Sequence, residues 1–364
     1  MSKVEAMYVH IPFCKNICSY CDFAKVFYSF SYEDKYLNSL FREIENNKPN
    51  KCKTIYIGGG TPSVLSEQGL ERLLFFLKQY LNDNYQEFTI EVNPETITEE
   101  KVKLFKNYGI NRVSIGVQSF NDDILKLLGR EHNYNDVRKC VELLNKYNLE
   151  NYSFDFIYGV NGLTIEHIKK DLGYIDILKP KHLSFYSLIL EDNTCLKVNK
   201  YNELDEDAVV EQYDFIYNEL NKRGYIQYEV SNYCKRGFES KHNLVYWKNE
   251  QYYGFGLSAA GYLENYRYTN TKNLTKYLNG DVNRTIEQVT IEDQKVEFIM
   301  LGLRLNVGIS LSEYKKRFNE DLLEIKKEEI ECLLNDNLIK ISGDILSTTY
   351  KGMLLLDVVI LKLI

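Results

Sequence analysis

Residues 7–21 read MYVHIPFCKNICSYC, a short apolar strand that runs into a loop carrying Cys14, Cys18 and Cys21. The spacing allows the three sulfurs to reach one iron cluster. Three thiolates are one fewer than the four that saturate a cubane cluster, so one iron would stay open to another ligand, as a catalytic zinc keeps an open position. We therefore predict a cluster with an open iron. A structural zinc site is the alternative, but no second cysteine pair completes its four ligands.

The composition limits the classes to which the protein can belong. With 364 residues, 44% of them hydrophobic, the chain can bury a sizeable core. Its net charge of −7 argues against a general nucleic-acid-binding protein. The sequence has no secretory signal and no run of about eighteen apolar residues, so we expect no spanning helix. The cysteines outside the loop are scattered, which fits a reducing, cytoplasmic location.

Short β-rich segments alternate with helical segments over the first two thirds of the chain. We expect strands at residues 7–11, 54–58, 88–92, 112–117, 153–157 and 182–187. We expect helices at residues 33–46, 67–80, 99–108, 136–147, 165–178 and 207–223. Six strand–helix units in succession indicate parallel strands joined by right-handed crossovers. The pattern by itself leaves open whether they form an open sheet or a barrel.

Glycines and polar residues gather where the predicted strands end. Gly58-Gly59-Gly60-Thr61-Pro62 follows the second strand, and Glu91 lies in the third. Gln118 follows the fourth strand, and Asp155 interrupts the apolar fifth. The carboxyl ends of parallel strands carry the functional groups in such folds, so we expect these residues to share one site with the cysteine loop. Each polar residue alone could equally be a solvated or ion-paired side chain.

The last third of the chain does not continue this alternation of strands and helices. Residues 236–284 contain His242-Asn243-Leu244-Val245-Tyr246-Trp247 and a run of small residues at 254–261. From residue 285 the pattern is mostly helical, with capping-box spacing at Ser310 and Glu313 and a two-stranded wing expected near 339–347. We therefore divide the chain into residues 1–235, a connecting segment 236–284, and a winged-helix-like domain 285–364.

The cysteine spacing resembles that of the radical SAM superfamily. In that superfamily three cysteines hold a [4Fe–4S] cluster whose open iron chelates S-adenosylmethionine, and an electron from the cluster cleaves the sulfonium to a 5′-deoxyadenosyl radical. The cofactor carries the difficult chemistry, and the protein positions it. The resemblance implies an α/β fold: a partial (βα)6 TIM-like barrel with a small, mostly α-helical C-terminal domain.

Over nearly the whole chain the motifs are similar to those of the oxygen-independent coproporphyrinogen III oxidase family. The matching stretches are 8–21, 58–62, 116–120, 128–130, 155–159, 228–232 and 242–247. Within that family the chain resembles the haem chaperone branch. The oxidases carry a fourth cysteine two positions after the third, where this chain has Phe23. The chaperones carry a His-Asn-x-x-Tyr-Trp motif, which residues 242–247 match.

The resemblance assigns roles to individual positions. Tyr8, Gly59 and Glu91 would contact S-adenosylmethionine on the cluster, and Tyr20 would add an aromatic face. The positions that line a second S-adenosylmethionine site in the oxidases are here Gly60, Thr61, Gln118, Arg130 and Asp155.

The same motif comparison implies a haem site. His242 would contact haem, and Tyr246 and Trp247 would offer flat apolar surface to the macrocycle.

The resemblance therefore implies a haem chaperone that binds haem as cargo and passes it to acceptor haemoproteins such as respiratory cytochromes. The partners that it implies are an electron donor such as flavodoxin or ferredoxin and, for membrane-bound acceptors, peripheral association with a membrane; no nucleic acid is expected. Whether the protein is an enzyme stays open. The alternative function is oxidative decarboxylation of coproporphyrinogen III to protoporphyrinogen IX.

Overall fold

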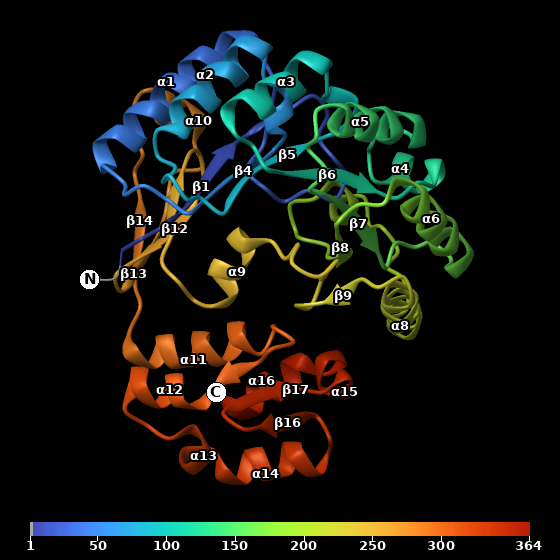
Figure 1. Ribbon diagram of the computed structural model, residues 1–364, viewed down its shortest axis with the longest axis vertical. Helices are drawn as coiled ribbons and strands as arrows, with labels where there is room; N and C mark the ends of the chain where they lie inside the picture. Colours follow the sequence, from blue (N-terminus) through green and yellow to red (C-terminus); the bar gives the residue numbers. More distant parts are fainter. Residues whose placement is uncertain (1–2) are drawn as a thin grey trace.

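The computed structural model describes residues 3–364, and its centre is a nine-stranded sheet (Figure 1). The sheet order is β11-β1-β4-β5-β6-β7-β8-β10-β9, so the sheet has two edges and the barrel is open. Its six central strands run parallel: β1 (Ala6–Ile11), β4 (Thr54–Gly59), β5 (Glu87–Val92), β6 (Arg112–Gln118), β7 (Tyr152–Tyr158) and β8 (His182–Ser187). The edges are formed by the parallel strand β11 (Tyr253–Phe255) and the antiparallel strands β10 (Asn232–Cys234) and β9 (Ile226–Gln227).

A helix follows each of the six central strands. These helices are α1 (Phe30–Asn47), α2 (Glu67–Lys78), α3 (Glu99–Tyr108), α5 (Tyr134–Lys146) after the short α4 (Asp122–Leu127), α6 (Ile165–Leu178) and α8 (Glu206–Lys222) after the short α7 (Cys195–Val198). Figure 1 shows them in an arc around the outer face of the sheet. The partial barrel of six parallel units is therefore confirmed. The predicted bounds of α3, α6 and β8 match those observed, and no other predicted end differs by more than three residues.

The two faces of the central strands differ in chemistry because successive side chains of a strand point to opposite sides. On the outer face, apolar side chains such as Ile57, Ile90 and Ile115 are fully buried under the helices. On the inner face, the alternate positions are polar and line the lumen of the barrel: Tyr8, Tyr56, Glu91, Ser114, Asp155 and Ser184. The fold therefore encloses a polar interior that opens at the carboxyl ends of the strands.

The chain then builds a connecting region and a second hydrophobic core. The connecting region contains α9 (Lys241–Trp247), α10 (Leu274–Leu278) and the antiparallel strands β12 (Ala260–Leu263), β13 (Tyr266–Thr269) and β14 (Thr285–Gln288). The second core lies among α11 (Ile291–Gly302), α12 (Leu311–Phe318), α13 (Leu322–Ile325), α14 (Lys327–Asn335), α15 (Tyr350–Leu354) and α16 (Leu356–Leu363). We call these helices and their sheet the C-terminal unit, which lies below the barrel in Figure 1.

The C-terminal unit carries a three-stranded sheet where two strands were expected. The predicted wing corresponds to β16 (Ile339–Ser342) and β17 (Ile345–Thr348), and β15 (Ile309–Ser310) adds to β17. Ser310 caps α12, as its spacing indicates, by accepting a hydrogen bond from the Glu313 amide at 3.0 Å. The proposed boundary at residue 285 remains a prediction, since β14 begins there and pairs with β13.

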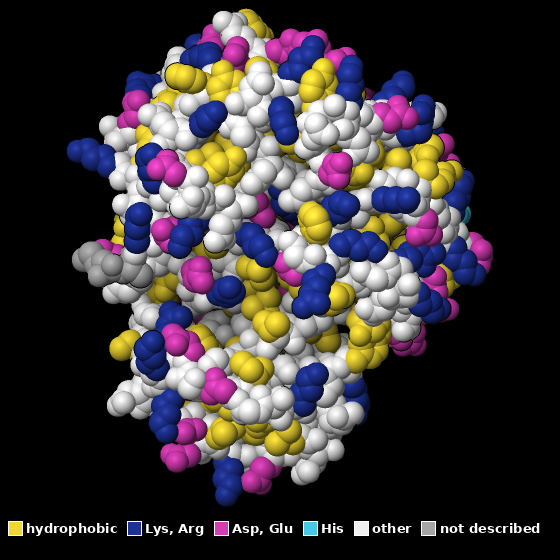
Figure 2. Space-filling model, in the orientation of Figure 1, with side chains coloured by type: hydrophobic (Ala, Val, Ile, Leu, Met, Phe, Trp, Pro, Cys, Tyr) yellow, Lys and Arg dark blue, Asp and Glu magenta, His cyan; other side chains and the backbone are white. Residues whose placement is uncertain are grey.

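The barrel and the C-terminal unit are joined by backbone hydrogen bonds. The Val230 amide donates to the Arg304 carbonyl at 3.2 Å, and the Asn306 amide donates to the Tyr228 carbonyl at 3.0 Å. The loop between β10 and β9 therefore lies against the segment that leaves α11. Across residues 3–364, the longest apolar helical stretches fall short of what a bilayer crossing requires. On the face shown in Figure 2, basic and acidic side chains are interspersed.

Candidate cofactor site

The cysteine loop is fixed against the glycine-rich turn after β4. Within it β2 (Phe13–Cys14) pairs in parallel with β3 (Val26–Phe27). The Thr61 hydroxyl donates to the Cys14 sulfur at 3.8 Å. A Cβ on Gly60 would lie 2.8 Å from the same sulfur, so only glycine lets the turn approach so closely. The turn continues into the short 3₁₀ helix at Pro62–Val64, and a second one at Pro94–Thr96 follows β5.

The far side of the loop is held by the segment after α4. The Ser19 amide donates to the Leu128 carbonyl at 3.1 Å, and a guanidinium nitrogen of Arg130 lies 3.6 Å from the Cys18 sulfur. The Cys21 amide donates to the Cys18 carbonyl at 3.3 Å. Two parts of the barrel that are far apart in sequence thus position the loop.

All three cysteines line one cavity of about 560 Å³ at the carboxyl ends of the strands, which we call the cysteine cavity. Eight other predicted site residues line the same cavity: Tyr20, Gly59, Gly60, Thr61, Glu91, Gln118, Arg130 and Asp155. Tyr8 lines the adjoining cavity described below. The fold therefore brings the predicted cluster and S-adenosylmethionine residues together, although their sequence positions span almost 150 residues.

The donor chemistry of the three thiols fits an iron–sulfur cluster. Burial raises the pKa of Cys14 to about 11 and also raises the pKa of Cys21, and the neighbouring cysteines add to both effects. Thiolates bind metal, so charge on these sulfurs needs compensation by a bound cation. Among residues 3–364, no three His, Cys, Asp or Glu side chains converge as ligands of a single ion do. A cubane gives each thiolate its own iron, so three sulfurs around one cavity suit it.

Glu91 is held at the inner wall of the cavity. Its carboxylate accepts hydrogen bonds from the Tyr56 hydroxyl at 2.7 Å and the Gly59 amide at 3.0 Å. Burial raises the pKa of Glu91 to about 7, and the charge of Asp155 adds to the effect, while both hydrogen bonds oppose it. Gly59 has φ +119°, and a Cβ there would lie 2.7 Å from His10, so this position requires glycine.

The opposite wall carries Gln118, Arg130 and Asp155. A register shift between Gly116 and Gln118 interrupts the pairing of β6 with β7, and Gln118 has φ 62°. One guanidinium nitrogen of Arg130 donates to Asn93 at 2.9 Å and to the Gly116 carbonyl at 2.6 Å. Asp155 accepts from the Ser114 hydroxyl at 2.9 Å, and burial raises its pKa. This wall is preorganised by hydrogen bonds between neighbouring strands.

A second cavity of about 730 Å³ adjoins the first, and we call it the aromatic cavity. Both cavities are lined by Phe23, Tyr56, Gly59, Glu91, Tyr186 and Asn243, so they share a wall. Beyond that wall the aromatic cavity is lined by Tyr8, Tyr246, Trp247 and Tyr252, and by Glu229 and Arg304. It therefore lies where α9 of the connecting region, the barrel and the C-terminal unit meet.

His242 is placed behind this cavity as a fully hydrogen-bonded core residue. The Thr54 hydroxyl lies 2.9 Å from its Nδ1, and the Tyr246 hydroxyl lies 2.7 Å from its Nε2. Its ring stacks on Tyr56 with centroids 5.3 Å apart, and none of its surface is exposed. Burial, aided by the charge of Arg112, lowers the pKa of His242 to about 3. Contact with haem would thus require the ring to leave one of its partners.

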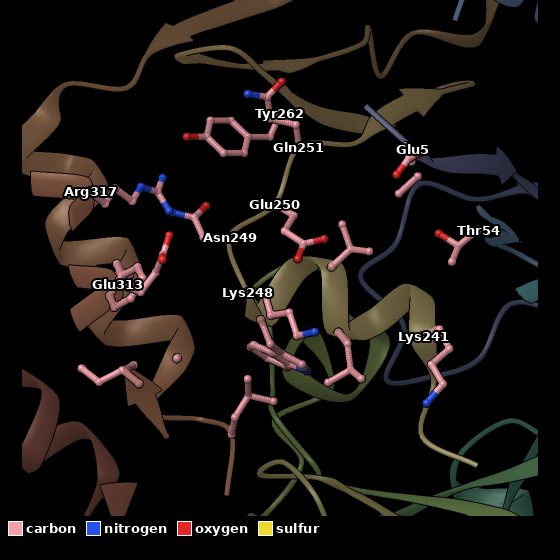
Figure 3. Close-up of a pocket in the computed structure, with 18 of the residues that line it drawn as sticks. Glu5, Thr54, Lys241, Lys248, Asn249, Glu250, Gln251, Tyr262, Glu313 and Arg317 are labelled. Carbon is pink, nitrogen blue, oxygen red and sulfur yellow. The ribbon is translucent and has the colours of Figure 1, made fainter. Parts of the chain in front are cut away.

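A third cavity, about 900 Å³, lies on the other side of α9 (Figure 3). Figure 3 shows Lys248 and Glu250, just after α9, between Arg317 of α12 and Glu5 before β1. Its lining mixes charges of both signs, and among the described residues Trp247 is the only predicted haem-site residue that lines it. Trp247 lines both this cavity and the aromatic cavity, so α9 forms the partition between them.

Our reading of the sequence missed the polar lumen below the cysteine cavity. Arg112, Ser114 and Ser184 line that cavity, yet none was predicted as a site residue. The sequence does contain a signal for this lumen. Polar residues occupy alternate positions of β6 (Arg112, Ser114) and of β8 (His182, Ser184), whereas strands buried on both faces are usually apolar throughout.

Comparison with known proteins shows which family models and relatives this chain matches. The model of the radical SAM superfamily matches residues 8–175, and that of the HemN C-terminal domain matches residues 289–355. The heme chaperone HemW of Lactococcus lactis is 41% identical over 360 residues, covering 97% of this chain and 95% of the relative. HemW of Bacillus subtilis is 36% identical, covering 97% of each chain. HemW of Escherichia coli is 33% identical, covering 82% of each.

Among solved structures, coproporphyrinogen III oxidase (HemN) from Escherichia coli is similar with a TM-score of 0.86. The match covers 99% of this chain and 90% of that one at 21% sequence identity. At that identity the likeness establishes the fold alone.

Proposed function

The chain belongs to the HemW family of radical SAM proteins, and from that premise we propose that it binds haem and delivers it to acceptor haemoproteins. The proposal includes a [4Fe–4S] cluster on Cys14, Cys18 and Cys21, with S-adenosylmethionine beside it. When bound, the cluster's open iron would supply a site for the amino and carboxylate groups of S-adenosylmethionine. In this proposal respiratory cytochromes are the acceptors, flavodoxin or ferredoxin is the electron donor, and the protein associates peripherally with the membrane.

The observation that carries the proposal is the shared wall between the cysteine cavity and the aromatic cavity. Ligand cavities of 300–1,000 Å³ lined by aromatic side chains suit flat apolar molecules. At about 730 Å³ the aromatic cavity has a size that suits a porphyrin, with Tyr246 and Trp247 as flat surfaces. Arg304 supplies a cation at its edge. A haem there would lie next to the cluster and S-adenosylmethionine rather than apart from them.

We propose the S-adenosylmethionine contacts that the family resemblance implies, and the grouping of these residues around the two cavities supports them. Gly59 and Glu91 line both cavities and Tyr8 lines the aromatic cavity. These three would contact the molecule on the cluster, with Tyr20 alongside. Gly60, Thr61, Gln118, Arg130 and Asp155 line the cysteine cavity on its other sides and would hold a second molecule, should one bind.

The test is anaerobic reconstitution of the full chain, followed by haem titration and product analysis in one sample. We expect a brown iron–sulfur chromophore, one haem per chain, and transfer of that haem to an apo-haemoprotein. Incubation with coproporphyrinogen III, reductant and S-adenosylmethionine should yield no sustained protoporphyrinogen IX. Turnover of that substrate, or zinc in place of iron in the purified protein, would overturn the proposal.

The same titration tests His242, whose ring we propose contacts haem after it leaves Tyr246. His242→Ala should lower haem affinity at least about tenfold and change the Soret spectrum. Tyr246→Phe removes a hydrogen bond worth about 1 kcal/mol that competes for Nε2, so haem affinity should rise several-fold. His167→Ala, on α6 away from both cavities, is the control. Unchanged affinity and spectrum in His242→Ala would remove His242 from the site.

A further inference from the structure

Arg112 is a buried cation at the floor of the cysteine cavity. It is the first residue of β6, only 2% exposed, and lines the cavity together with Ser114 and Asp155. Val113, the next residue along β6, is fully buried on the opposite, outer face of the sheet. The side chain of Arg112 therefore points into the lumen, below the cluster loop.

The guanidinium of Arg112 is short of partners. Its Nε has no hydrogen-bond acceptor among the described residues. The acidic side chains whose charges act on it most, Glu87 and Asp155, are engaged elsewhere. Glu87 accepts from the Lys241 amide at 2.7 Å, and Asp155 accepts from the Ser114 hydroxyl. Buried polar groups in native proteins are almost always paired, so Arg112 is a departure that needs an explanation.

Arg130 shows what a positioned arginine in the same cavity looks like. One of its terminal nitrogens is bound by Asn93 and the Gly116 carbonyl. The Nε of Arg130 also lacks a partner, but among the described residues Arg112 has no such hydrogen bonds at its terminal nitrogens either, so its fork of donors remains available to a ligand.

Arg112 stays protonated although its side chain is buried. Burial acts against the charged form, but the charge of Glu87, to which Asp155 adds, favours it, and the pKa of Arg112 stays above its usual value. A planar guanidinium presents five donors in a geometry that matches a carboxylate bidentately. The cavity also contains the acidic residues Glu91 and Asp155, so an anionic group would be repelled there without a cation.

We propose that Arg112 anchors a carboxylate that reaches the floor of the cysteine cavity. That chemistry has two sources, a propionate that haem extends from the adjoining aromatic cavity or the amino-acid carboxylate of a second S-adenosylmethionine-type molecule, and both rest on the proposed function. Anchoring at the lumen floor would hold such a ligand by its anionic end.

The test uses cluster-reconstituted, full-length Arg112→Lys, which keeps the positive charge and loses the bidentate fork. Two ligand pairs differ in their carboxylates: haem against haem dimethyl ester, and S-adenosylhomocysteine against 5′-methylthioadenosine. For one pair, the variant should lose at least about tenfold in affinity for the carboxylate-bearing member and much less for the other. Because each comparison is made within one protein sample, a lower folded fraction of the variant affects both members equally.

Arg138→Lys, on the exposed face of α5, is the matched control and should leave all four affinities unchanged. The pair that responds identifies the source of the carboxylate. Equal losses within both pairs, or no loss in either, would overturn the proposal and leave Arg112 as a counter-ion of the lumen carboxylates. A failure of the wild-type protein to bind haem would reject the proposed function, and the nucleoside pair would still decide the role of Arg112.

Discussion

Glu91 shows how the cavity sets the protonation state of a single residue. Its burial favours the neutral acid, whereas the hydrogen bonds from Tyr56 and Gly59 favour the carboxylate. The result is a pKa of about 7, well above the 4.5 of an exposed glutamate. Glu91 therefore changes charge within the pH range in which the protein is handled, and a bound cationic ligand would draw it to the ionised form.

This pKa predicts how stability depends on pH. Because the pKa is raised in the folded state, the stabilising contribution is complete below pH 4.5 and is lost as the pH rises through 7. Glu91→Gln abolishes that loss. The melting temperature of the variant relative to wild type should therefore rise by roughly 5 °C between pH 5 and pH 8, measured by calorimetry on ligand-free protein. Exposed Glu71→Gln should show no such trend, and a difference independent of pH would contradict the prediction.

At the scale of elements, α9 depends on a carboxylate from a distant strand. Glu87 of β5 accepts hydrogen bonds from the Lys241 amide at 2.7 Å, the Ser240 hydroxyl at 3.2 Å and the His242 amide at 3.2 Å. Acceptors at the amino end of a helix satisfy amides that have no partner within it. Glu87 thus fixes the helix that presents Tyr246 and Trp247 to the aromatic cavity.

Glu87→Gln should loosen α9 without reaching the cluster. The charge-assisted hydrogen bonds that it loses are worth about 2 kcal/mol of unfolding free energy, and haem affinity should fall several-fold because the aromatic wall is less fixed. Iron and sulfide per chain should stay at the wild-type value. Glu166→Gln, in an exposed ion pair at the start of α6, is the control. Loss of iron together with haem binding would show that α9 and the cysteine loop are not separable in this way.

At the scale of the whole molecule, the aromatic cavity is built by parts that have separate hydrophobic cores. The barrel and the connecting region contribute Tyr8 and Tyr246, and the C-terminal unit contributes Arg304. The backbone hydrogen bonds between Val230 and Arg304 and between Tyr228 and Asn306 join the two sides near the cavity. A ligand in the cavity would therefore bridge both cores.

Hydrogen exchange measures this bridging directly. Haem should slow exchange at residues 228–232, 243–247 and 304–306 together, by about tenfold or more. Residues 356–363 of α16, which packs one face into the second hydrophobic core, should be unaffected. Protection confined to the barrel segments would mean that haem does not contact the C-terminal unit.

Much of the architecture follows from local patterns. The six strand–helix units were predicted with ends within a few residues, because each depends on a hydrophobic period of about two or 3.6 residues within one segment. The cluster of polar residues at strand ends was also predicted, since parallel strands place their carboxyl ends together. In contrast, β15 is two residues long and has too little pattern to be recognised.

The sequence by itself determined the order of elements, the cysteine loop and the family motifs, because these are properties of short segments. Only the tertiary structure decided that His242 is held by Thr54 and Tyr246, that Glu87 holds α9, and that Arg112 faces the cysteine cavity without a partner for its Nε. Thr54 and His242 are 188 residues apart in sequence. The hydrophobic periodicity of a single segment cannot predict such a contact, because the contact forms only when the sheet curls and the connecting region packs over the lumen.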